Sequence, residues 1–175
     1  EGYSVSECPQ KVRQIISLTG QFSAVDESLT GKENLILMGQ LRHLSDPAKH
    51  ACRLLEYFSL SSCGNQKVSS YSGGMKRKLD IAMSLIGHPK AIFLDEPTTG
   101  LDPQSRHNMW DLIKTLRASG VTIFLTTQYL EEAETLADTV AILHNGSIIA
   151  EGTPRELKSY LPHGALEIFF QDQKN

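Results

Sequence analysis

The sequence lacks the features that would place it in a membrane, outside the cell or on a nucleic acid. No apolar run approaches the roughly 20 residues that a spanning helix needs, and no secretory signal peptide is present. The 17 Lys and Arg do not outnumber the 20 Asp and Glu, which argues against nucleic-acid binding. The only cysteines are Cys8, Cys52 and Cys63, which are too few and too widely spaced for a disulfide framework or a zinc site. They predict reduced thiols in a cytosolic protein.

What is present is ordinary for a globular chain of 175 residues, with 40% hydrophobic and 21% charged residues. This length fits one domain, or one domain with an added lobe. Any role at a membrane is therefore expected from the cytosolic side, through a partner.

The order of the predicted elements indicates an α/β fold. Short apolar runs predict strands over 12–19, 91–95 and 121–126, of which the last two are expected to be buried. Capping residues predict helices that begin near Thr30, Asp46, Ser72 and Asp102. Alternating strands and helices imply a parallel sheet covered by helices, and the helical stretch 25–87 implies an inserted lobe. The remaining predictions are a helix over 129–137, a hairpin around Asn145-Gly146, a helix over 154–160 and a strand over 166–170.

Two adjacent acids, Asp95 and Glu96, follow the apolar run at residues 91–94. In an open α/β sheet the carboxyl ends of strands face the ligand. Neighbouring carboxylates are unfavourable unless they meet a cation or a proton, so Mg²⁺ with a nucleotide phosphate is the expected ligand. Taken alone, Leu-Asp-Glu could equally be a solvated strand end.

A second candidate is Ser72-Gly73-Gly74 at the start of a predicted helix. Free backbone N–H groups at a helix N-terminus bind anions, and glycines let a phosphate approach closely. Ser72 could also be a plain N-cap. The basic residues 76–78 that follow are expected to form mainly a solvated face.

Together these motifs resemble the ATPases of the ATP-binding cassette (ABC) family. Residues 92–102 are similar to the Walker B strand, catalytic glutamate and D-loop, and residues 71–75 to the signature motif. Gln21 resembles the Q-loop glutamine. Gln128 stands where the wider family usually has histidine, which puts the full hydrolytic rate in question because an amide cannot carry a proton near neutral pH. The resemblance covers residues 12 to about 157. Residues 71–75 and 126–133 together are most similar to the daunorubicin-resistance type of multidrug ATPase, in which glutamine at this position is native.

The resemblance implies ATP and Mg²⁺ as cofactors and assigns a role to each candidate residue. Glu96 would be the general base and Gln128 would contact the γ-phosphate, as the catalytic pair. Asp95 and Gln21 would bind Mg²⁺. The nucleotide-binding residues would be Gln21, Ser72, Gly73, Gly74, Asp95 and Asp102.

The resemblance also implies a P-loop NTPase fold, in which a catalytic subdomain (1–24 and 88–162) carries a helical signature subdomain (25–87), followed by an extension (163–175). The expected partners are a second ABC ATPase domain, as a homodimer or heterodimer, and a separate transmembrane permease, with no nucleic acid. The expected location is peripheral, on the cytoplasmic side of the cell membrane. The expected function is ATP hydrolysis that powers export of a drug or lipid-like substrate.

One expected motif does not occur: the sequence contains no Gly-x-x-x-x-Gly-Lys-Ser/Thr. That phosphate loop should precede the Gln21 strand, so the fold is expected to be truncated at its amino terminus. The isolated chain should then bind ATP poorly and leave strand edges and apolar surface exposed. An alternative function is a non-catalytic module that lends its signature face to a partner ATPase. A soluble ABC protein of translation or DNA repair fits less well, because long coiled coils and basic linkers are absent.

Overall fold

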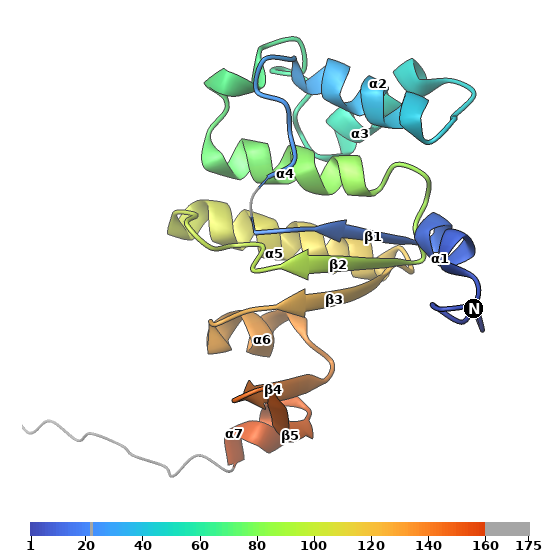
Figure 1. Ribbon diagram of the computed structural model, residues 1–175. Helices are drawn as coiled ribbons and strands as arrows, with labels where there is room; N and C mark the ends of the chain where they lie inside the picture. Colours follow the sequence, from blue (N-terminus) through green and yellow to red (C-terminus); the bar gives the residue numbers. More distant parts are fainter. Residues whose placement is uncertain (22, 160–175) are drawn as a thin grey trace, which may run out of the picture. The chain divides into compact units, whose positions relative to one another are not determined.

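A computed structural model describes residues 1–21 and 23–159 of the chain (Figure 1). The chain divides into two compact units, Glu1–Leu130 and Glu131–Asn175. The predicted division into catalytic and helical subdomains stays a prediction.

A three-stranded parallel sheet organises the first unit. Its strands are β1 (Ile16–Thr19), β2 (Ala91–Asp95) and β3 (Thr122–Thr126), in the order β1-β2-β3. The register pairs Leu18 with Phe93 and Phe93 with Phe124. The predicted α/β class with a parallel sheet is confirmed.

The first predicted strand is wrong over residues 12–15, which belong to helix α1 (Pro9–Ile15). Pro9 occupies the first helical turn, where its missing N–H costs nothing and its fixed φ favours a helix. The β-branched residues Val12 and Ile15 are therefore helical, and the strand begins only at Ile16.

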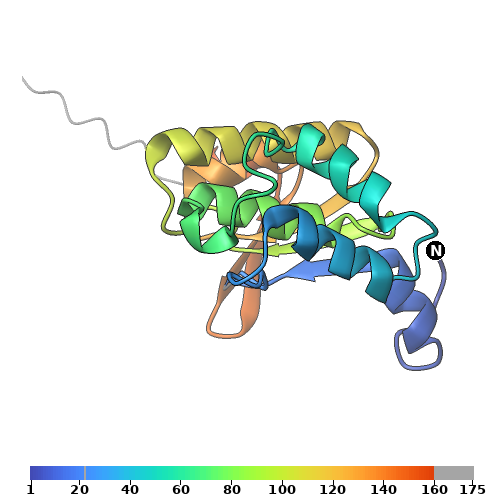
Figure 2. The same ribbon diagram turned by 90° about the horizontal axis from the view of Figure 1, so that it is seen from above.

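The two faces of this sheet differ in how they are covered. On one face Thr19, Ile92 and Leu94 are buried. Helix α5 (Pro103–Ala118) packs on β3, and helix α4 (Gly73–Ser84) packs on β1 and runs beside α5 (Figures 1 and 2). On the other face Leu18 is 70% exposed and Phe124 59% exposed.

The prediction of a buried strand at 121–126 is therefore wrong in its burial. Within the described part of the chain β3 pairs with β2 alone, so its other edge is open. Parallel sheets normally have both faces and most edges covered. The expected exposure of a strand edge and of apolar surface is found here.

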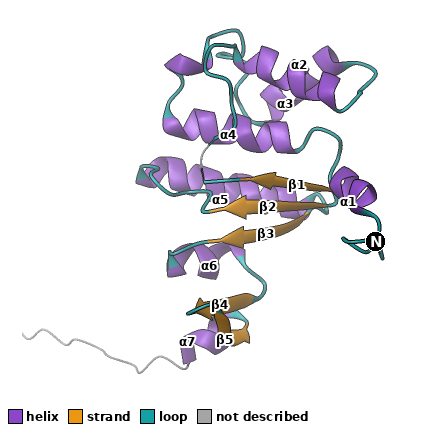
Figure 3. Cartoon of the chain, in the orientation of Figure 1, coloured by secondary structure: helices purple, strands orange, loops and turns teal. Residues whose placement is uncertain are grey.

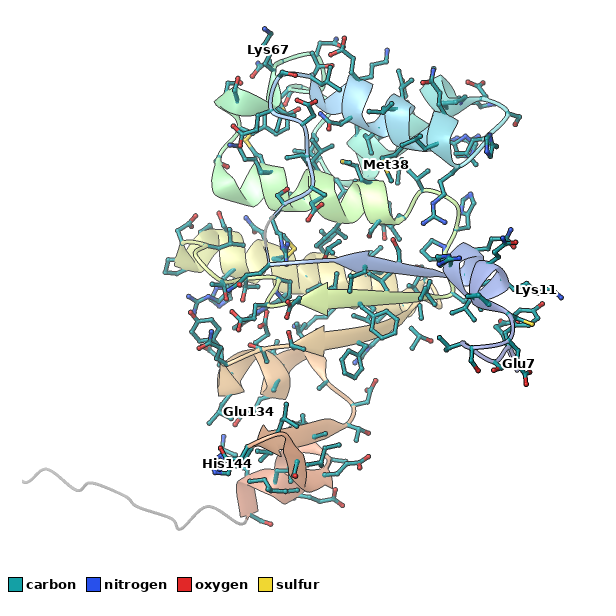
Figure 4. All side chains as sticks on the ribbon, viewed as in Figure 1. Glu7, Lys11, Met38, Lys67, Glu134 and His144 are labelled. Carbon is teal, nitrogen blue, oxygen red and sulfur yellow. The ribbon has the colours of Figure 1, made fainter. Side chains whose placement is uncertain are left out.

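Helices α2 (Gly31–Leu41) and α3 (Pro47–Tyr57) pack against each other and against α4. The predicted starts are confirmed. Thr30 and Glu33 form a reciprocal capping box at α2, and the Asp46 carboxylate accepts a hydrogen bond from Lys49 N at α3. A single 3₁₀ turn, Val68–Ser70, lies in the predicted loop after α3, and Lys67 before it lies at the outer edge of this helical layer (Figure 4).

Tyr71 anchors the loop that leads into α4. Its side chain is buried, and its hydroxyl donates a hydrogen bond to the Cys63 carbonyl at 2.8 Å. The ring lies so close to Gly31 that a Cβ on that glycine would overlap the hydroxyl. Glycine at position 31 is therefore required by a close approach, and the start of α2 is fixed against the residue before Ser72.

The second unit is small. Helix α6 (Leu130–Leu136) begins at its boundary, and β4 (Val140–His144) pairs antiparallel with β5 (Ser147–Gly152), followed by α7 (Pro154–Ser159). Asn145 and Gly146 both have positive φ, as the predicted hairpin turn requires. Lys158 and Glu134 form an ion pair at 3.0 Å. The predicted strand over 166–170 and the extension 163–175 lie outside the described residues.

Candidate nucleotide and magnesium site

The carboxyl ends of three adjacent strands bring the predicted catalytic side chains together. The arrowheads of β1, β2 and β3 point the same way (Figure 3). Gln21 follows β1 by two residues, Glu96 directly follows β2, and Gln128 follows β3 by two residues. Because the strands are parallel and neighbours, these side chains meet at one edge of the sheet.

The Glu96 carboxylate is the centre of this cluster. Gln128 Nε2 lies 2.9 Å from Glu96 Oε1 and 3.0 Å from Oε2. The Thr99 hydroxyl donates to Oε2 at 2.9 Å, and Gln21 Nε2 donates to the same oxygen at 3.4 Å. These donors hold the carboxylate in one orientation.

Asp95 is held by a different partner. The Thr126 hydroxyl donates to Asp95 Oδ1 at 2.5 Å, and the same hydroxyl accepts from Glu96 N at 3.1 Å. The Glu96 N–H also donates to the Thr126 carbonyl at 3.1 Å. The end of β3 therefore fixes both acids against β2, and the Asp95 side chain stays exposed.

The two carboxylates and the amide oxygens of Gln21 and Gln128 are hard oxygen donors of the kind that Mg²⁺ prefers. A divalent cation would also offset the repulsion between adjacent acids. The donor set at this edge of the sheet therefore fits Mg²⁺ with a nucleotide phosphate. Among the described residues, no group of three or more His, Cys, Asp and Glu side chains forms a metal cluster, so phosphate oxygens or water would have to complete the coordination.

Glu96 has a backbone conformation that is unusual for its residue type. Its φ is 45°, in the left-handed region that glycine and asparagine favour. Such a conformation costs of order 1–3 kcal/mol and persists where surrounding structure enforces it. Here Pro97 and the hydrogen bond from Thr99 N to the Glu96 carbonyl complete the tight turn.

The signature turn lies at the amino terminus of α4, as predicted. Ser72 is the N-cap, and its hydroxyl accepts from Met75 N at 3.3 Å. Beside the turn is a cavity of about 180 Å³, lined by Ser72, Gly74, Met75, Lys78, Ser105 and Asn108. Helix N–H groups, a hydroxyl and a lysine are donors that suit an anion.

Asp102 has a local structural role as the N-cap of α5. Its Oδ1 accepts from Ser105 N at 2.9 Å, which makes it the N-cap of α5. Hydrogen bonds from the Ser105 side chain and backbone hold the pKa of Asp102 below its usual value. Its predicted contact with nucleotide stays a prediction.

The interpretation of residues 76–78 as a solvated basic face is wrong for Arg77, which is buried. Its neighbours differ: Lys76 pairs with Glu27 at 2.5 Å, and Lys78 lines the cavity at the signature turn. Sequence reasoning also missed Thr99 and Thr126, which orient the acids. A hydroxyl at the end of a strand beside another strand's acid is the signal that could have revealed Thr126.

No helix in the described part of the chain is both long and apolar enough to cross a membrane.

Comparison with known proteins supplies the family. A family model described as ABC transporter matches residues 2–99. The chain is 47% identical over 176 residues to the daunorubicin/doxorubicin resistance ATP-binding protein DrrA of Streptomyces peucetius, covering 99% of this chain and 53% of that protein. It is 49% identical over 176 residues to the doxorubicin resistance ATP-binding protein DrrA of Mycobacterium tuberculosis, with the same coverage of both chains.

It is also 41% identical over 174 residues to the Nod factor export ATP-binding protein I of Burkholderia lata, covering 98% of this chain and 57% of that protein. The chain thus spans about half the length of the curated relatives it matches. With the family model covering more than half of its residues, and with these relatives, the chain belongs to the ABC transporter family.

Proposed function

We propose that this chain acts in ATP binding and hydrolysis within an ABC exporter. The observation that carries the proposal is the meeting of Gln21, Glu96 and Gln128 at the ends of three adjacent parallel strands, with Asp95 beside them. The relatives' names refer to daunorubicin and doxorubicin resistance and to export of a Nod factor, and we extend to this chain the export of a drug or lipid-like substrate.

In this proposal each side chain has a separate task. Glu96 accepts the proton of the attacking water, and the donors from Gln128 and Thr99 hold its carboxylate in place. Asp95 and Gln21 hold Mg²⁺, which when bound neutralises charge on the phosphates. Gln128 can donate a hydrogen bond to the γ-phosphate or to water but cannot supply a positive charge.

The signature turn is proposed to act on a nucleotide held by another subunit. Ser72, Gly73 and Gly74 would offer their donors to the phosphate of a second ABC ATPase domain, with Asp102 at the interface. A homodimer or heterodimer on the cytoplasmic side of the membrane would then drive a separate permease.

A second candidate function is a non-catalytic module that lends its signature face to a complete partner. The observation that favours it is the cavity formed at Ser72 and Gly74, which lies at the start of α4.

One mixing experiment separates the two candidates. The chain is added to a full-length relative whose own signature serine is replaced by alanine, and Mg-ATP turnover is measured. Restored turnover that is lost with Ser72→Ala in the chain supports a working signature face. In a second mixture the relative keeps its signature serine but has its own catalytic glutamate replaced by glutamine. Turnover above that of this relative alone, lost with Glu96→Gln in the chain, shows that the chain is catalytic, whereas no such turnover supports the non-catalytic module. Absence of any restored turnover contradicts both.

A further inference from the structure

Arg77 is a buried cation in the middle of the polar machinery. It lies on α4, five residues after the signature serine, and only 7% of its surface is exposed. A buried charge is unfavourable unless its donors are all engaged, and an arginine presents them in a rigid planar fork. Its partners therefore show what the residue holds in place.

Three of the partners are backbone carbonyls, one just after β1 and two at and just after the end of β2. Arg77 Nη1 donates to the Gly20 carbonyl at 2.6 Å, and Nη2 donates to the Asp95 carbonyl at 2.8 Å. Nε donates to the Pro97 carbonyl at 3.1 Å. One guanidinium thus joins the end of β1, the end of β2 and the turn that follows β2.

Each of those segments carries a member of the candidate site. Gly20 immediately precedes Gln21, the Asp95 carbonyl belongs to the proposed metal ligand, and Pro97 immediately follows Glu96. The carbonyls of Gly20 and Pro97 each lie one residue from Gln21 and Glu96, and both accept hydrogen bonds from the same guanidinium. The separation between Gln21 and Glu96 therefore depends on Arg77.

Asp80 holds the guanidinium from the other side. Its Oδ2 lies 3.3 Å from Arg77 Nη1, and its Oδ1 accepts from Ala24 N at 3.2 Å. Asp80 is itself buried, and burial raises its pKa, while the Ala24 N–H and Arg77 oppose that rise. The pair therefore attaches both ends of the Gln21 loop, at Gly20 and at Ala24, to one turn of α4.

We propose that Arg77 is a positioning residue, which sets the spacing of Gln21, Asp95 and Glu96 and links that spacing to the orientation of α4, the helix that begins at the signature turn. Because Ser72 is the N-cap of α4, a rotation of this helix on contact with a nucleotide would pull on all three carbonyls at once. The catalytic meaning of this coupling rests on the proposed function, but the coupling itself does not need nucleotide.

The test is hydrogen–deuterium exchange of the full chain without nucleotide, so its result is independent of whether the chain hydrolyses ATP. The variants are Arg77→Gln, which removes the charge, and Arg77→Lys, which keeps the charge on a compact ammonium that lacks the planar fork of donors. The matched control is Arg53→Lys, at an exposed arginine on α3.

Both Arg77 variants are expected to exchange about tenfold faster at the amides of Ala24, Glu96 and Leu101, which are hydrogen-bonded in these segments, while α2 and α5 stay unchanged. The Arg53→Lys control should match the parent chain throughout. Unchanged exchange at these amides overturns the proposal. An equal increase across α2 and α5, or loss of folding in both variants, also overturns it, because Arg77 would then be a general stabilising residue.

Discussion

Tyr71 and Gly31 should behave as a coupled pair, because the tyrosine hydroxyl occupies the space that a side chain at position 31 would need. In Tyr71→Phe the Cys63 carbonyl loses the tyrosine hydroxyl but keeps the hydrogen bond from Gln66 N at 2.8 Å, so the cost is about 0.5–1.5 kcal/mol. In Gly31→Ala the new Cβ overlaps the hydroxyl, and overpacking of this kind costs typically 1–3 kcal/mol.

The double variant should cost much less than the sum. Without the hydroxyl, the nearest ring atom to the new Cβ is Cζ at 3.2 Å, which a shift of a few tenths of an ångström relieves. The alanine then also gains helix propensity of up to about 1 kcal/mol at the start of α2. We expect a coupling free energy of about 1–2 kcal/mol between the two positions.

The assay is urea unfolding followed by circular dichroism at 222 nm, with Trp110 fluorescence as a second probe of the first unit. Burial raises the pKa of Tyr71, so the hydroxyl remains a donor at any neutral or mildly alkaline pH. The control cycle combines Tyr71→Phe with Leu37→Ala, at an exposed position on the same helix as Gly31, and should be additive. Additivity within about 0.5 kcal/mol for Tyr71 and Gly31 would refute the steric reasoning.

Three further predictions concern the site and the sheet. In an assembly that hydrolyses ATP, Glu96→Gln should lower turnover by about 10²–10⁴ with nucleotide binding retained, and turnover within twofold of the parent would remove Glu96 from the role of base. Because burial raises the pKa of Asp80 above its ordinary 3.8, the folded state binds more protons than the unfolded state above that value, and this group's contribution to stability falls as pH rises through the folded pKa. Asp80→Asn should remove that fall. The unfolding free energy of the parent chain and of the variant is measured from pH 3.5 to 7, and parallel curves for the two proteins would contradict the prediction. Phe124→Thr should reduce binding of the dye ANS by the chain with little loss of stability, since the ring is 59% exposed; equal dye binding would place the apolar surface elsewhere.

The elements that the sequence predicted well are those whose limits are set by neighbouring residues. Asp46-Pro47 and Asp102-Pro103 each combine an N-cap with a proline in the first turn, and both helices begin there. The short apolar run before Asp95 could be assigned to a strand for a similar reason, because acids and Pro97 end it at once. Such signals act within a few residues and need no knowledge of the rest of the fold.

The features that the sequence did not predict depend on distant parts of the chain. Arg77 stands between two lysines, and nothing local distinguishes it from them, because its burial is decided by carbonyls of Gly20, Asp95 and Pro97. The exposure of Phe124 likewise depends on which strand and helix lie beside β3. The meeting of Gln21 with Glu96 could be anticipated only through the resemblance to a known family.

The left-handed backbone at Glu96 has a consequence for selection experiments. Asparagine and glycine adopt a φ of 45° at lower cost than glutamate, so either substitution would relieve strain at the turn. Both would also remove the carboxylate proposed as the base. A library screened for heat resistance alone should therefore enrich asparagine or glycine at position 96, whereas a library screened for ATP turnover, in an assembly that hydrolyses ATP, should exclude them. At this one position the residue that gives the highest thermal stability and the residue that supports activity are expected to differ.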